Sequence, residues 1–278
     1  SVTIDVPDRL GARVARWLVI AAVSTGVLIA VQRATRRMLP LAALFSLTLV
    51  FPDEAPSRFR LALRSPSART VKRRLDSADE TGPGETPGEA ARELVELVGA
   101  LSRHDRLTRG HSERVRAYTI MIGEEMGFEG AALDRLRWAG LLHDVGKTLV
   151  PSEILNKPGS LTDEEFSIVK THTTHGQRLA AGLAGWLGDD VRAIDEHHER
   201  WAGGGYPYGL RGEQIAQAAR IVSVADAFDV MTSARSYKKP VPAEAARAEL
   251  DRCSGTHFQP EVVRSMLNVS LGRLWRAM

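Results

Sequence analysis

A histidine and an aspartate stand next to each other, as His143 and Asp144, at the end of an apolar helical stretch. Residues 133–142 have helical period, and Leu136 and Ala139 lie seven and four positions before His143, on the same helix face. His143 therefore continues the buried face of this helix. The adjacent carboxylate of Asp144 would be energetically costly to bury without a partner. Taken alone, the pair is most simply a capping aspartate next to a hydrogen-bonded core histidine.

Other histidines and aspartates also replace apolar residues at inward positions of helical stretches. His172 lies three positions after Val169, and Asp226 lies four positions after Val222. The full set of candidate metal ligands is His111, His143, Asp144, His172, His197, His198 and Asp226. So many buried polar groups need a strong common partner. Imidazole and carboxylate ligands without thiolate suit iron, manganese or zinc, and a set this rich indicates two ions.

Two adjacent metal ions hold a bridging hydroxide and polarise a phosphoryl group, so the predicted chemistry is hydrolysis of a phosphoester. Lys147, four residues after His143, can neutralise charge on a phosphate oxygen, although its spacing also fits a solvated loop lysine. The catalytic candidates are therefore Asp144 and Lys147. The remaining histidines, His104, His175 and His257, are interpreted as surface or supporting residues.

The elements that position these residues are predicted to be helices, which gives an all-α fold class. The chain has 278 residues and 44% hydrophobic content, enough for one core plus extra segments. From Ala90 onward the pattern is helical almost throughout, with loops expected at 146–161 and 199–213 and no alternating strand pattern. Cys253 is the single cysteine, which excludes a disulfide framework or thiolate cluster and fits a reducing compartment.

Two apolar stretches, 17–31 and 38–51, precede this helical region. Each is shorter than the roughly 20 residues of a comfortable membrane span. The first is predicted to span; the second contains Pro40 and is compatible with a span, a re-entrant piece or an interfacial helix. A signal peptide is the competing interpretation, without an evident cleavage site. Because the chain begins with Ser1 rather than Met, we expect a fragment or a processed chain.

Positive charge is concentrated in the N-terminal part. Residues 1–74 hold 13 Arg and Lys against 4 Asp and Glu, a net charge of +9, whereas the rest holds 24 against 30, a net charge of −6. This distribution favours an anionic membrane surface over a nucleic acid polymer as partner. We place the basic cluster from Arg58 to Arg74, and the domain after it, in the cytoplasm.

Residues 77–89 are rich in Gly, Pro and Glu and are predicted to be a flexible linker. This linker separates a membrane-associated part from a catalytic part. The predicted organisation is a hydrophobic and basic segment at 1–76, the linker at 77–89 and a catalytic domain at 90–278.

The motifs, taken in order, resemble the HD-GYP family, the cyclic di-GMP phosphodiesterase branch of the HD superfamily. The resemblance runs from about Leu101 to about Pro260. Its motifs are Gly110-His111, His143-Asp144-Val145-Gly146-Lys147, His172 with Gly176, His197-His198-Glu199, Gly205-Tyr206-Pro207 and Asp226-Ala227-Phe228-Asp229. The resemblance implies a bundle of five core helices plus extra ones. It also implies the same seven metal ligands, with Lys147 beside the metals and the scissile phosphate.

The resemblance also implies substrate and supporting roles outside the ligand set. Arg235 and Lys238 match positions that grip the substrate phosphates; without this match they are an ordinary basic loop. Asp229 matches a position that hydrogen-bonds within the site. Tyr206 belongs to the family's signature loop and is expected to buttress it or contact a partner domain. A homodimer or a signalling protein remains open as a further partner.

Departures from the family pattern affect the number of ions and the substrate loops. Leu107 stands where members with a third metal carry Glu, so two ions are expected, with iron or manganese favoured over zinc. Ala202 and Ser236 replace residues usual near the substrate, and no metal ligand is lost. The predicted function is hydrolysis of cyclic di-GMP to linear pGpG, with GMP as an open further product. Another cyclic dinucleotide or phosphoester, or a binding module without turnover, are the alternatives.

Overall fold

The structure is a computed structural model that describes residues 110–233 and 240–275. Eleven α-helices fall in this part: α5 (His111–Glu125), α6 (Gly130–Leu142), α7 (Ser152–Leu155), α8 (Asp163–Lys170), α9 (His172–Leu179), α10 (Ala184–Leu187), α11 (Ala193–Glu196), α12 (Gln217–Thr232), α13 (Ala243–Arg252), α14 (Pro260–Asn268) and α15 (Leu271–Trp275). Four short 3-10 helices join them: η1 (Val145–Leu149), η2 (Ala181–Leu183), η3 (Gly188–Arg192) and η4 (Gly212–Gln214).

The all-α fold class is confirmed, since these described ranges contain no β-strand beyond an isolated bridge between Ser254 and Phe258. None of their helices combines the length and the hydropathy that a membrane crossing requires. Several predictions concern residues outside the described part: the membrane segment at 1–76, the linker at 77–89, and Arg235 and Lys238.

The two stretches expected to be loops contain short helices. The first, 146–161, holds most of η1 and all of α7, and the second, 199–213, overlaps η4. Helices of three to five residues complete little more than one turn, so they leave no periodic pattern in the sequence.

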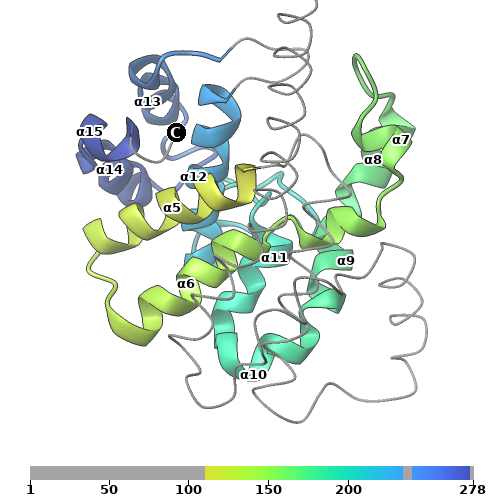
Figure 1. Ribbon diagram of the computed structural model, residues 1–278, viewed down its shortest axis with the longest axis horizontal. Coiled ribbons are helices and arrows are strands. Elements are labelled where there is room, and N and C mark those ends of the chain that lie inside the picture. The colour runs from red at the N-terminus through yellow and green to blue at the C-terminus, as the bar shows by residue number, and fades with distance from the viewer. Residues whose placement is uncertain (1–109, 234–239, 276–278) are drawn as a thin grey trace, which may run out of the picture. The chain divides into compact units, whose positions relative to one another are not determined.

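The core forms where α5, α6 and α12 pack together (Figure 1). α12 buries residues on most of its faces, as a helix in the middle of a domain does. Tyr118 of α5 meets Phe228 of α12 edge to face, with ring centroids 5.1 Å apart, a geometry that stabilises beyond the area it buries. This packing places the beginning of α5, and therefore His111, beside the middle of α12.

Glycines let three pairs of elements approach closely. A β-carbon at Gly146 in η1 would lie 1.8 Å from the carbonyl oxygen of His172, and one at Gly176 in α9 would lie 2.7 Å from Ile194 of α11. At Gly140 in α6 it would lie 2.8 Å from a side-chain oxygen of α5. Because only hydrogen fits at these contacts, the glycines bring the ends of the helices within side-chain reach of one another.

Candidate metal centre

The candidate ligands sit mainly at the ends of helices that converge. His111 is the first residue of α5 and His172 the first of α9, whereas His143 directly follows α6 and His197 directly follows α11. These four imidazoles are at most 3% exposed. Asp226 comes from the middle of α12.

The carboxylate of Asp144 stands between two groups of histidines. Its Oδ2 lies 3.5 Å from Nε2 of His111 and 3.4 Å from Nε2 of His143. Its Oδ1 lies 3.5 Å from Nε2 of His172 and 4.0 Å from Nε2 of His197. Each oxygen of this one side chain therefore faces a different pair of imidazoles.

The histidines are oriented by their second ring nitrogen. Nδ1 of His143, His172 and His197 lies 2.8, 2.7 and 3.1 Å from carbonyl oxygens three or four residues earlier in the chain. A carbonyl only accepts, so Nδ1 must carry the proton and donate it. The other nitrogen, Nε2, then presents its lone pair toward Asp144, which is the usual arrangement of metal-binding histidines.

These lone pairs lack proton donors. Nε2 of His172 and Nε2 of His197 are only 3.4 Å apart, and within the described residues Nε2 of His143 is buried without a hydrogen-bond partner. Burial lowers the pKa of His172 to about 3 and holds the pKa of His197 well below its usual range, so both rings stay neutral. Metal cations held by these rings would satisfy the lone pairs.

Carboxylates make the other half of the cluster attractive to positive charge. Nε2 of His111 lies 3.3 Å from Oδ1 of Asp226. Burial opposes protonation of His111, but hydrogen bonds with Asp144, Asp226 and Asp229 outweigh it and raise its pKa to about 10. This half of the site therefore binds a proton strongly, and a metal ion placed there would replace that proton.

The ligand atoms fall into two sets, each with its atoms within 4.8 Å of one another: His111, His143 and Asp144, and His172, His197 and His198. Asp226 adjoins the first set through His111. The structure thus brings all seven candidate ligands together. Nitrogen and oxygen donors in this mixture fit a divalent metal such as iron, manganese or zinc.

Asp229 supports His111 from the side away from the cluster. Its Oδ2 lies 2.7 Å from Nδ1 of His111, and its carboxylate accepts two hydrogen bonds from Arg114, at 2.6 and 3.0 Å. Sequence reasoning had not selected Arg114. Its position three residues after His111, one turn along the same face of α5, was the available signal.

Changing Asp229 to asparagine should weaken metal binding by roughly 10- to 100-fold, the usual effect of removing a carboxylate that orients a metal-binding histidine. Competition with a chelator for the bound metal measures this. The control is Asp134→Asn, which removes a carboxylate that pairs with Arg137 at 2.8 Å on the surface of α6. Equal metal affinity of Asp229→Asn and the wild type would show that Asp229 does not support the site.

Lys147 lies at the edge of the cluster and contacts its central carboxylate. Its Nζ donates to Oδ2 of Asp144 at 2.6 Å. Burial opposes ionisation of Asp144, but the positive charge of Lys147 and a hydrogen bond from His111 hold its pKa well below the usual range. Asp144 is therefore ionised and available as a ligand, with a cation already beside it.

The loop after His198 folds tightly and carries Tyr206. The Glu199 carboxylate accepts from the backbone N–H groups of Tyr208 and Gly209, at 2.6 and 3.0 Å. A β-carbon at Gly205 would lie 2.4 Å from Cα of Glu199, so this turn requires glycine. The result is that the Tyr206 ring stacks on the His198 ring, with centroids 4.8 Å apart and planes 28° from parallel.

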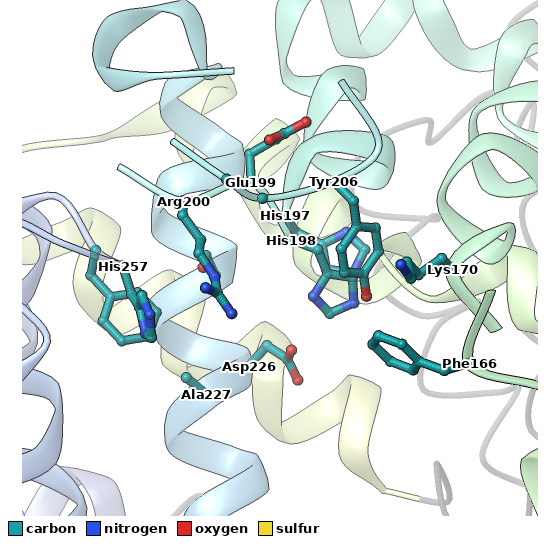
Figure 2. Close-up of a pocket in the computed structure, with 14 residues that line it drawn as sticks. Phe166, Lys170, His197, His198, Glu199, Arg200, Tyr206, Asp226, Ala227 and His257 are labelled. Carbon is teal, nitrogen blue, oxygen red and sulfur yellow. The ribbon is translucent and has the colours of Figure 1, made fainter. Parts of the chain in front are cut away.

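A cavity of about 390 Å³ opens onto one side of the cluster, against His197, His198 and Asp226. Figure 2 shows Phe166 and Lys170 at one end of it and Arg200 and His257 at the other. The complete lining is Phe166, Lys170, His197, His198, Glu199, Arg200, Gly204, Gly205, Tyr206, Ser223, Asp226, Ala227, His257 and Phe258. Sequence reasoning had not selected Phe166, Lys170 or Arg200, and it had given His257 only a surface or supporting role. A pocket that joins helices far apart in sequence has no periodic signal.

A sequence model of the HD domain family matches residues 97–262. Among curated proteins, the chain is 42% identical to a cyclic di-GMP phosphodiesterase of Thermotoga maritima, over 64% of this chain and 49% of that protein. It is 40% identical to a cyclic di-GMP phosphodiesterase of Pseudomonas aeruginosa, over 63% of this chain and 42% of that protein.

A third relative has a different named substrate. The chain is 36% identical to the 3′3′-cGAMP-specific phosphodiesterase 2 of Vibrio cholerae, over 64% of this chain and 35% of that protein. This chain therefore spans about half or less of the length of each of the three curated relatives.

Proposed function

This chain belongs to the HD domain family, in its HD-GYP branch, and we propose that it is a metal-dependent phosphodiesterase that hydrolyses cyclic di-GMP in bacterial second-messenger signalling. The observation that carries this proposal is the position of Asp144. Its two oxygens face two sets of imidazole nitrogens, and the cluster opens onto a cavity of about 390 Å³. That arrangement suits two divalent ions next to a bound phosphate.

Two ions, with iron or manganese favoured over zinc, would activate water and polarise the phosphoryl group. In the proposed reaction a water oxygen forms a bond to phosphorus, and the bond from phosphorus to a 3′ oxygen breaks. The 3′ oxygen leaves with a proton, so the product is linear pGpG. Lys147, whose ammonium lies 2.6 Å from Asp144, is placed to neutralise charge that builds up on the phosphate oxygens.

Incubation of the purified protein with cyclic di-GMP, followed by identification of the product, tests this proposal. We expect pGpG, its loss after chelation of the metal, and its recovery when iron(II) or manganese(II) is added back. A His143→Ala variant should release none under the same conditions. Metal-loaded protein that binds cyclic di-GMP without cleaving it would instead establish a binding module.

A second candidate substrate is 3′3′-cGAMP, which the name of the Vibrio cholerae relative supports. The two cyclic dinucleotides share both phosphodiester bonds and differ in one purine, so the same metal chemistry serves either. Parallel assays at equal concentration decide between them through kcat/KM. A larger kcat/KM for 3′3′-cGAMP would make it the preferred substrate.

We further propose that the apolar stretch 17–31 attaches the protein to a membrane, with the catalytic domain in the cytoplasm. Support comes from the sequence alone, through this uncharged stretch and the net charge of +9 in residues 1–74. Recovery of the protein in the soluble fraction of lysed cells would contradict this. The family resemblance alone supports Arg235 and Lys238 as phosphate-binding residues.

A further inference from the structure

The helix α8 contributes none of its residues to the core. It is held instead by polar contacts at its beginning. Thr162 and Glu165 form a reciprocal capping box, with hydrogen bonds of 3.2 and 2.8 Å, and Lys157 donates to Glu165 at 2.6 Å. The capping box supplies hydrogen-bond partners for backbone N–H groups at the start of the helix, and the Lys157 contact holds the Glu165 side chain in place. The apolar residues of α8 are therefore not explained by core packing.

Phe166 is the largest of these residues and is 45% exposed. It lines the cavity together with Lys170, one turn further along α8. The ammonium of Lys170 lies 5.0 Å from the centroid of the Phe166 ring and 5.7 Å from that of Tyr206, within the range of a cation–π contact. Phe166 and Lys170 therefore form a cation–π pair at this end of the cavity.

Tyr206 lies between this Phe166–Lys170 pair and the candidate metal centre. Its ring stacks on His198, and Phe166 meets it edge-on at 6.4 Å with planes 82° apart. The rings of His198, Tyr206 and Phe166 therefore form a continuous aromatic wall (Figure 2). This wall leads from His198, in the candidate metal centre, to the Phe166 end of the cavity, with the ammonium of Lys170 beside it.

We propose that Phe166 and Lys170 form a nucleotide subsite, in which Phe166 stacks on one purine base of the cyclic dinucleotide and Lys170 binds an adjoining phosphate. This inference rests on the proposed function. A phosphate at the cluster carries its nucleoside outward, and a purine offers a flat face that stacks on aromatic side chains. The lysine supplies the positive charge that a phosphate requires.

The opposite end of the cavity has a similar composition. His257 and Phe258 form an aromatic pair there, with ring centroids 6.1 Å apart. Arg200 lies near His257 at this end of the cavity (Figure 2). The backbone N–H of Trp201 donates to the carbonyl of His257 at 3.0 Å, which links His257 to the loop that carries Tyr206. Aromatic and cationic side chains at both ends suit a ligand with two bases and two phosphates.

Steady-state kinetics of the metal-loaded protein with cyclic di-GMP test the subsite. Loss of one base stack, in Phe166→Ala, should raise KM by roughly 5- to 150-fold, with kcat and metal content unchanged. Phe166→Trp should retain a KM close to that of the wild type, because it keeps an aromatic face. Lys170→Met should also raise KM.

Ile168→Ala is the matched control, because Ile168 lies on the same helix and is 40% exposed but does not line the cavity. A KM of Phe166→Ala within twofold of the wild type, in a protein that cleaves cyclic di-GMP, would overturn the subsite alone. Wild-type protein that cleaves bis(p-nitrophenyl) phosphate but neither cyclic di-GMP nor 3′3′-cGAMP would overturn the proposed function, and the subsite with it.

Discussion

Replacement of Asp144 by asparagine should lower cyclic di-GMP hydrolysis at least about 1000-fold and leave at most one tightly bound metal ion per chain. Asparagine has nearly the same shape, so the fold should persist. Its amide nitrogen, however, replaces one of the two oxygens that face the histidine sets, and an amide nitrogen does not serve as a metal ligand. The bridge between the two sets is then lost.

Metal analysis and turnover of the same preparation measure this effect. The control is Asp190→Asn, which removes a carboxylate that accepts from Arg135 at 3.1 Å, away from the cluster. It should keep both the metal and the activity. An Asp144→Asn protein with two bound ions and undiminished turnover would show that Asp144 does not bridge.

Replacement of Gly146 by alanine should have the second largest effect, a loss of about 3 kcal/mol or more of folding stability. The added β-carbon would lie 1.8 Å from the carbonyl oxygen of His172 and 2.5 Å from the backbone nitrogen of Gly176. Both are backbone atoms of α9, so relief requires η1 and α9 to separate. That separation would move Asp144 away from His172, and metal binding should weaken as well.

Thermal unfolding measures the stability loss, which corresponds to a fall in Tm of roughly 6–12 °C for a domain of this size. Gly185→Ala is the matched control, because a β-carbon at Gly185 in α10 would meet nothing within 4 Å. It should leave Tm nearly unchanged. If Gly146→Ala melts within 2 °C of the wild type and keeps its metal, the close approach of η1 to α9 does not position the site.

Helical periodicity found most of the candidate cluster, because its residues continue buried stripes. Leu136 and Ala139, which identified the inward face before His143, are 1% and 0% exposed. The same reasoning selected His172, three positions after Val169, and this residue is 1% exposed. A stripe is a local property of the chain, so one sequence suffices to recognise it.

The two-sided position of Asp144 was not predictable in this way. It depends on the turn of η1 against α9 through Gly146, a contact between segments that no periodicity connects. The subsite at Phe166 was missed for the same reason, since it forms only where α8 meets the loop of Tyr206. Sequence pattern therefore predicted which residues face inward, and tertiary contacts decided how they meet.

The metal content of anaerobically purified protein, measured on the sample that is assayed with cyclic di-GMP, tests the proposed function most directly. We expect about two metal ions per chain and release of pGpG, with both lost in His143→Ala. Metal-free protein with undiminished turnover, or fully metal-loaded protein that binds the dinucleotide and releases no product, would contradict it.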